Sequence, residues 1–284
     1  MLGAIIGDTI GSVYEFNNIK IIDFPLFSPQ SNYTDDSITT MAVADWLLTD
    51  PTHGMDTLEA SLIRFAKKYP CPMGGYGGGF NRWLFHPEDL GDYGSRDFKL
   101  GKRHPYNSWG NGSAMRCSAC GWMFDTLEET ERVAGLSAAI THNHPEGIKG
   151  AQATAAAIFL ARNGKTKKEI KDYIATKYGY NLDRTCDEIR VVYDWDSSCQ
   201  GTVPEAIVAF LDSTDFESSI RLAVSLGGDS DTLACITGGI AEAYYKEIPD
   251  DIVTGIWKIL PEDFMTILKD MERRTSYQLP RSIE

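Results

Sequence analysis

Two short acidic segments contain the residues of this chain that are best suited to bind a metal ion. Each combines two carboxylates with a hydroxyl group, and together they contribute Thr34, Asp35, Asp36, Asp229, Asp231 and Thr232. Carboxylate and hydroxyl oxygens are ligands that Mg²⁺ and Mn²⁺ prefer. This set of oxygens would suffice for two octahedral ions that keep some of their water.

The same residues could instead stabilise the starts of helices. Each segment precedes a run of apolar residues that is typical of a helix, and Asp, Ser or Thr at such a position accepts hydrogen bonds from free N–H groups. Capping explains one acid in each segment but leaves the second acid without a partner. The presence of two such segments in one chain favours a metal site.

Residues 2–16 are predicted to form a helix with a stripe of glycines along one face. The stripe consists of Gly3, Gly7 and Gly11. Because glycine destabilises a helix by about 1 kcal/mol relative to alanine, its repetition indicates that another backbone or a ligand approaches closely. Asp8 and Glu15 would share one face of this helix, either as a core acid and a surface acid or as two groups directed at the metal site.

A polar loop bounded by glycines is the second candidate site. It contains Gly110, Asn111, Gly112 and Ser113 and precedes a helical run that begins near Met115. Backbone N–H groups between such a loop and a helix can bind a phosphate, which Arg116 could reinforce. An ordinary Asn-Gly turn with a serine cap would explain the same residues, with Arg116 paired to an acid.

Two histidines, His142 and His144, lie in the segment 141–145 just before another predicted helix. No cysteine or third histidine lies nearby in the sequence to complete a zinc site. A hydrogen bond to a substrate, or an ordinary turn, is therefore the better interpretation of this segment.

The composition is that of a soluble globular protein. The chain has 284 residues, of which 43% are hydrophobic and 24% are charged, and its net charge is −13. This charge argues against general binding of nucleic acid or of a membrane surface, because no basic stripe is available to neutralise phosphates. The first residues resemble neither a signal peptide nor a membrane span, so a cytoplasmic location is expected.

Helical periodicity recurs along the chain, and no segment shows the alternation of a β-strand. We therefore predict an all-α fold in one domain over residues 1–284. The predicted spans include about 38–49, 56–68, 129–141, 147–162, 166–177, 250–258 and 261–274, and a buried helix after Thr232.

Two further local predictions follow from proline and capping residues. A helix should begin at 202–204 with Pro204 in its first turn, and Asp215 should cap the next helix. Residues 70–111 and 178–202 are predicted to be irregular. The glycine string 74–79 is interpreted as a mobile lid, because long loops in compact domains usually serve function.

Taken in order along the chain, these segments resemble the motifs of the ADP-ribosylglycohydrolase family. The matching blocks are 3–8 with Glu15, 33–37, 110–116, 141–145, 202–206 and 215–243. Each block alone is only moderately specific, but the ordered set spans almost the whole chain.

The resemblance implies an orthogonal bundle of helices with a dinuclear Mg²⁺ or Mn²⁺ centre in a cleft. It implies that the metals are bound by Thr34, Asp35, Asp36, Asp229, Asp231 and Thr232. Glu15, Asp35 and Asp36 would be the catalytic carboxylates. The residues that hold ADP-ribose would be Asn111, Gly112, Ser113, Met115 and His144.

The expected activity is metal-dependent hydrolysis of the bond between ADP-ribose and its acceptor, which reverses ADP-ribosylation of a protein or a related conjugate. One alternative is a two-metal phosphoesterase, since similar carboxylate sets catalyse in-line displacement at phosphorus. Another is a non-catalytic relative that only binds ADP-ribose. The acceptor could be arginine, serine, a nucleic-acid base, an acetyl ester or a small molecule.

Overall fold

The computed structural model of the protein describes residues 1–87 and 103–281, and 64% of these described residues are helical. No β-strand occurs in these residues, which confirms the predicted all-α class. The first helices are α1 (Leu2–Gly11), α2 (Asp35–Thr49), α3 (Met55–Lys68), α4 (Gly78–Phe85), α5 (Gly112–Met115), α6 (Ser118–Met123), α7 (Leu127–Ala139) and α8 (Pro145–Arg162). The others are α9 (Lys167–Tyr178), α10 (Cys186–Val192), α11 (Cys199–Asp212), α12 (Phe216–Ser225), α13 (Ser230–Tyr245), α14 (Asp250–Trp257) and α15 (Glu262–Arg274).

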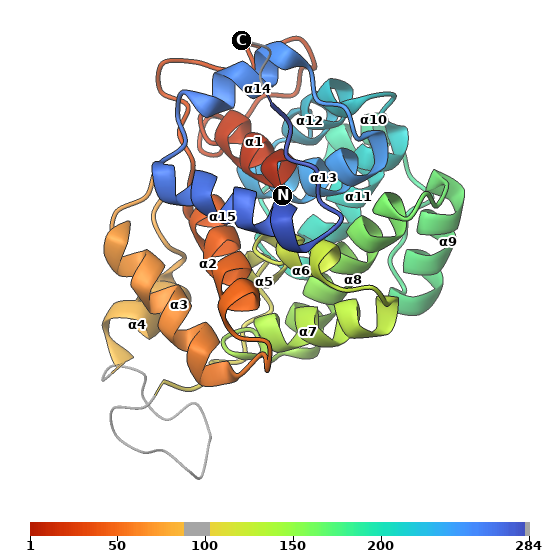
Figure 1. Ribbon diagram of the computed structural model, residues 1–284. Coiled ribbons are helices and arrows are strands. Elements are labelled where there is room, and N and C mark those ends of the chain that lie inside the picture. The colour runs from red at the N-terminus through yellow and green to blue at the C-terminus, as the bar shows by residue number, and fades with distance from the viewer. Residues whose placement is uncertain (88–102, 282–284) are drawn as a thin grey trace.

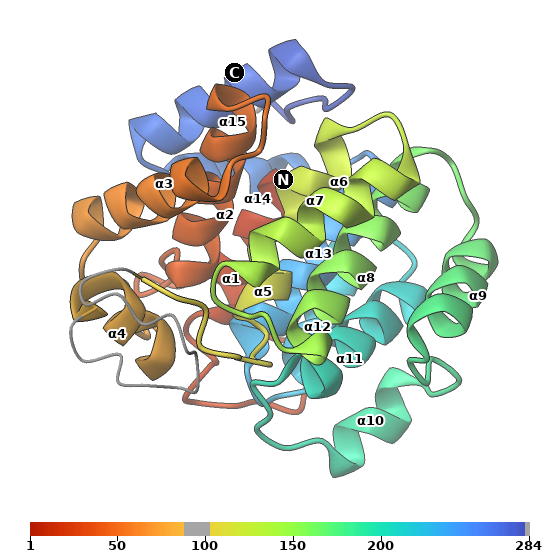
Figure 2. The same cartoon turned by 90° about the horizontal axis from the view of Figure 1, so that it is seen from below.

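The helices α1 and α13 form the centre of the fold. Both are buried along almost their whole length, and α2, α8, α11 and α12 pack around them. Figure 1 and Figure 2 show α3 and α4 on one side of this centre and α9 and α10 on the opposite side. A polar segment that opens α13 is therefore carried into the middle of the molecule.

The glycine stripe of α1 allows its close contact with α13. A Cβ added at Gly7 would lie closer than 3.0 Å to the backbone of Ala234, and one added at Gly3 would meet the carbonyl oxygen of Gly238. The predicted packing role of these glycines is thus confirmed. The helix itself is shorter than predicted, because it ends at Gly11.

Several predicted helix boundaries are confirmed, and others are wrong. Asp215 caps α12 by accepting a hydrogen bond from the backbone N–H of Ser218. The helix α11 begins at Cys199 because Ser198 caps it, so Pro204 lies inside the helix and not in its first turn. Pro204 has no backbone N–H to donate to the carbonyl oxygen of Gln200. Gln200 is exposed, so water can supply this hydrogen bond.

The two segments predicted to be irregular contain helices. In the first, α4 starts within the glycine string, while residues 88–102 of that segment lie outside the described residues. In the second, α10 is stabilised by a capping box in which Thr185 and Glu188 bond to each other's backbone N–H groups. In the described part of the chain, no helix is both long enough and apolar enough to cross a bilayer.

We expect Gly7→Ala to lower the free energy of unfolding by about 3 kcal/mol, because the added methyl group must push two packed backbones apart. Urea denaturation would measure the change. Gly78→Ala is the matched control, since nothing lies within 4 Å of the added Cβ there, and its effect should stay within about 1 kcal/mol. Equal stabilities of the two variants would contradict the assigned role of the glycine stripe.

Candidate active site

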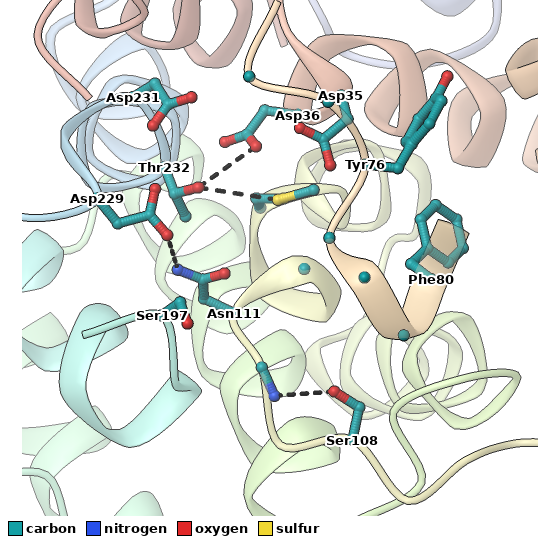
Figure 3. Close-up of a pocket in the computed structure, with 18 of the residues that line it drawn as sticks. Asp35, Asp36, Tyr76, Phe80, Ser108, Asn111, Ser197, Asp229, Asp231 and Thr232 are labelled. Atoms are coloured by element: carbon teal, nitrogen blue, oxygen red, sulfur yellow. Dashed lines mark hydrogen bonds between the residues drawn. The ribbon is translucent and has the colours of Figure 1, made fainter. Parts of the chain in front are cut away.

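The two acidic segments meet at the starts of two helices. Asp35 and Asp36 are the first residues of α2, and Asp229 and Asp231 lie at the start of α13. All four side chains and Thr232 line one cavity with a volume of about 470 Å³. The hydroxyl of Thr232 donates to Asp36 across this space, with 3.3 Å between Oγ1 and Oδ1 (Figure 3).

Glu15 also lines the cavity, although it is not on a helix. Because α1 ends at Gly11, Glu15 belongs to the turn that follows, and the prediction that it shares a helix face with Asp8 is wrong. One carboxylate oxygen from each of Glu15, Asp229 and Asp231 lies within 4.8 Å of the others. Three oxygens at this separation can bind one cation.

Asp8 does not line the cavity, but its carboxylate holds the start of α2 in place through hydrogen bonds. Its carboxylate accepts hydrogen bonds from the N–H and hydroxyl of Thr34, at 2.9 and 2.7 Å, and from the N–H of Ser37 at 3.0 Å. The hydroxyl of Ser37 donates to it as well. The oxygen of Thr34 is therefore engaged as a helix cap and a donor, and Thr34 is not among the residues that line the cavity.

The turn that carries Asp229 is held by two asparagines. Asn18 bonds Gly228 from both sides, accepting from its N–H at 2.8 Å and donating to its carbonyl oxygen at 2.9 Å. Asn111 donates to Asp229 Oδ2 at 2.7 Å. Gly228 has a φ of 67°, a left-handed conformation that favours glycine. Because asparagine is uncharged, Asn111 orients the Asp229 carboxylate without balancing its negative charge.

The carboxylates perturb one another strongly. Burial first, and then neighbouring carboxylates, raise the pKa of Asp35, Asp36 and Asp231 well above the usual range. The same causes raise the pKa of Glu15 to about 8, and burial raises that of Asp8 to about 6. Acids that are buried together in this way require a compensating charge or bound protons.

Two carboxylate oxygens at the centre of this group have no partner. Asp36 Oδ2 and Asp231 Oδ1 are buried, and neither has a hydrogen-bond partner in the described residues. An unsatisfied buried oxygen costs free energy, and a divalent cation would supply the missing interaction. The donor set and these two oxygens therefore fit a hard cation, as the sequence pattern predicts.

The glycine-bounded loop forms another part of the same cavity. Asn111, Gly112 and Met115 line it, so three of the predicted ADP-ribose residues lie beside the acids. Ser113 is fully buried and donates to the carbonyl oxygen of Gly147 at 2.7 Å, which fastens the loop to α8. Its hydroxyl is therefore used within the fold.

Of the two histidines, His142 lines the cavity and His144 does not. His144 caps α8, because its Nδ1 accepts from the N–H of Glu146 at 3.1 Å, and its ring packs on Trp109 at 5.5 Å. The two lie two residues apart and share a loop, so the spacing could not distinguish between them.

A chain of hydrogen bonds defines the protonation of His142. Thr141 Oγ1 lies 2.9 Å from Arg116 Nη2 and 2.7 Å from His142 Nδ1. A guanidinium group can only donate, so Thr141 Oγ1 accepts from Arg116. No other acceptor for the Thr141 hydroxyl is found among the described residues, so this hydroxyl donates a hydrogen bond to Nδ1. The imidazole proton then resides on Nε2. This nitrogen is the atom nearest to the position of a Cβ added at Gly112. Burial, and then Arg116, lower the pKa of His142 well below the usual range, so it is a neutral donor.

Aromatic side chains form much of the remaining wall, and the sequence reasoning missed them. They are Phe16, Tyr76, Phe80, Tyr106 and Trp195. Most come from segments without periodicity, and only their closeness to the glycine string or to Glu15 could have indicated a role.

Known proteins resemble this chain in sequence and in fold. The sequence model of the family described as ADP-ribosylglycohydrolase matches residues 1–278. The chain is 27% identical to the ADP-ribosylhydrolase ARH3 of Homo sapiens in an alignment 321 positions long, gaps included, which covers 88% of this chain and 86% of that protein. It is 24% identical to the ADP-ribosylarginine hydrolase Tri1 of Pseudomonas putida (strain GB-1), over 86% of this chain and 69% of that protein.

A solved structure described as an ADP-ribosylglycohydrolase-related protein complex has the same fold. Its TM-score is 0.72 at 21% identity, and the match covers 96% of this chain and 95% of the other. The predicted fold type is thereby confirmed.

The hydrogen-bond chain to His142 can be tested by nitrogen NMR, since the protein has only five histidines. We expect ¹⁵N shifts of a neutral imidazole that carries its proton on Nε2 at pH 7. Thr141→Val should remove this constraint and change the Nδ1 signal, because valine keeps the shape but has no hydroxyl. An imidazolium, or a proton on Nδ1 in the unaltered protein, would contradict the assignment.

The raised carboxyl pKa values predict how stability depends on pH without metal. On folding, the pKa of Asp8 rises from about 4 to about 6, and that of Glu15 rises to about 8. Between its unfolded and folded pKa values, each group binds more protons in the folded state than in the unfolded state. The free energy of unfolding should therefore fall between pH 5 and pH 8 in a chelating buffer, as measured by urea denaturation. Asp231→Asn should reduce the fall, whereas Asp187→Asn, on an exposed face of α10, should not. An equal fall in both variants would contradict this origin.

Proposed function

The chain belongs to the ADP-ribosylglycohydrolase family, and on that premise we propose that it hydrolyses the bond between the anomeric carbon of ADP-ribose and an acceptor. The products are free ADP-ribose and the unmodified acceptor. The observation that carries this proposal is the meeting of Asp35, Asp36, Asp229 and Asp231 in a cavity that also includes the Gly110–Gly112 loop. Relatives named as ADP-ribosylhydrolases support the same activity.

The acidic end of the cavity is the proposed site of two Mg²⁺ or Mn²⁺ ions. The proposed ligands are Thr34, Asp35, Asp36, Asp229, Asp231 and Thr232. When bound, such ions would orient ribose hydroxyls and a water molecule and lower the pKa of that water. The partnerless oxygens of Asp36 and Asp231 support the assignment. Thr34 would have to bind a metal while it caps α2, so it is the least available of the six.

The diphosphate of ADP-ribose is the proposed ligand of the glycine-bounded loop. Asn111, Gly112 and Met115 line this part of the cavity, and Ser113 fastens the loop from behind. His142 would add a neutral N–H donor, so it takes the substrate contact that the sequence pattern assigned to His144. Neutral donors bind phosphate oxygens without attracting the nearby carboxylates.

Glu15 is the proposed group for proton transfer. Its pKa near 8 means that it is mostly protonated at neutral pH, so it can donate a proton to the departing acceptor. A cation in the site would lower this pKa, and the resulting carboxylate could accept a proton from water. Asp35 and Asp36 also line the cavity and are the other proposed catalytic carboxylates. The developing positive charge on the ribose ring would be stabilised by the acids around it.

A panel of ADP-ribosylated arginine, serine, DNA and O-acetyl substrates, with and without Mg²⁺ or Mn²⁺, tests the activity directly. Chromatography of the products separates the alternatives. Intact ADP-ribose is expected, whereas a nucleoside monophosphate or phosphate would identify a phosphoesterase. Tight binding of ADP-ribose by calorimetry, with no turnover of any conjugate, would identify a binding protein instead of an enzyme.

Asp229→Asn should reduce turnover by about 100-fold or more, since metal assistance contributes several kcal/mol. Metal binding, followed by calorimetry with Mn²⁺, should weaken in parallel. The variant should still fold, because the asparagine carbonyl can accept the hydrogen bond from Asn111. Asp56→Asn, on an exposed position of α3, is the control and should retain full activity. Full turnover of Asp229→Asn in the presence of a chelator would refute the metal-dependent reaction.

A further inference from the structure

Exposed hydrophobic side chains gather on two segments beside the cavity. Seven large hydrophobic residues are exposed in the described part of the chain, and six of them lie within residues 16–22 and 191–195. Their exposed fractions range from 43% to 84%. We call the six the rim patch: Phe16, Ile21, Ile22, Val191, Val192 and Trp195.

The two segments lie next to each other. The rings of Phe16 and Trp195 stack with 5.5 Å between centroids and 18° between planes, and Lys20 Nζ donates to the carbonyl oxygen of Tyr193 at 2.7 Å. Both segments also rest on α12, through Arg221 on one side and Ser225 on the other. Figure 2 shows the loop after α1 along the lower edge of the molecule, beside the chain that leaves α10.

The rim patch is continuous with the cavity. Phe16 and Trp195 line the cavity and are also exposed, and Phe16 directly follows Glu15. Val191 and Val192 lie at the end of α10 and do not line it. A conjugate held in the cavity would therefore place its acceptor, and whatever the acceptor is attached to, close to this surface.

The charge around the rim patch is negative. Asp187 and Glu188 on α10 and Asp194 on the second segment are exposed. Two cations lie nearby: Arg190 is paired with Asp187 and also bonds Ser225, and Lys20 donates to two carbonyl oxygens. The three acids still outnumber these two cations. An apolar surface with an acidic border is complementary to a partner that carries both apolar and basic residues.

We propose that the rim patch docks the protein that carries the ADP-ribosylated side chain, and that it selects acceptors flanked by apolar and basic residues. The inference rests on the proposed function. A small conjugate needs only the cavity, whereas exposed apolar residues of this number at its mouth serve contact with a macromolecule. The patch thus points to a protein substrate in preference to a free small molecule.

The double variant Val191→Ser/Val192→Ser tests the proposal without touching the cavity. The probes are one cleavable linkage, chosen from the panel above, presented on the free amino acid, on a peptide with flanking lysines and leucines, and on a peptide with flanking glutamates. We expect the unaltered enzyme to favour the basic peptide about 10-fold in kcat/KM over the free conjugate. The double variant should lose most of this preference through a higher KM and hydrolyse the free conjugate normally.

Ala60→Ser, on an exposed position of α3 far from the patch, is the control and should behave like the unaltered enzyme. Equal losses on all three probes, or no loss on any, would overturn the docking surface. Sedimentation would also overturn it if the unaltered protein is a dimer and the double variant is a monomer. Binding of the unaltered protein, but not of the double variant, to anionic vesicles would overturn it as well. If the unaltered enzyme cleaves no linkage in the panel, the proposed hydrolysis fails first, and that result is distinct from a lost peptide preference.

Discussion

The crowding of five carboxylates in one cavity is the constraint on which the rest of this structure depends. Carboxylates that share one cavity repel each other. The backbone segments that carry them must therefore be held by contacts that do not use those charges. The close packing of Gly7 against Ala234 joins α1 to α13, and the carboxylate of Asp8 joins α1 to the start of α2. The free energy for holding the acids together therefore comes from packing and neutral hydrogen bonds, and the site itself lowers the stability of the metal-free fold.

Features of the chain that depend on local sequence could be predicted, and features that depend on remote partners could not. The acidic turns, the cap at Asp215 and most helix spans follow from residues within one or two turns. The box formed by Thr185 and Glu188 was equally local, yet it was overlooked because the apolar pattern around it is weak. The predicted start of α11 was wrong because proline is typical of a first helical turn, whereas Ser198 caps the helix several residues before Pro204.

The candidate site shows the same division. Its acids were identifiable as a group because hard cations require oxygen ligands, whichever helices present them. The role of Asp8 depends on Thr34 and Ser37, which approach it only through the packing of α2 on α1. The protonation of His142 depends on Arg116 and Thr141, whose side chains meet only in the folded protein. No spacing in the sequence encodes that meeting.

The chemistry of the cavity also explains why its proposed anion-binding part contains neutral donors. A free lysine or arginine beside the diphosphate would be attracted to Asp229 or Asp35 and would compete with the proposed metals for their oxygens. The one arginine that lines the cavity is buried, and its Nη2 is bonded to the carbonyl oxygen of Ser137 and to Thr141. Through Thr141 it also orients the His142 proton. In a chain with a net charge of −13, this arrangement would let one cavity hold the proposed cations and an anionic substrate side by side without joining its own charges into ion pairs.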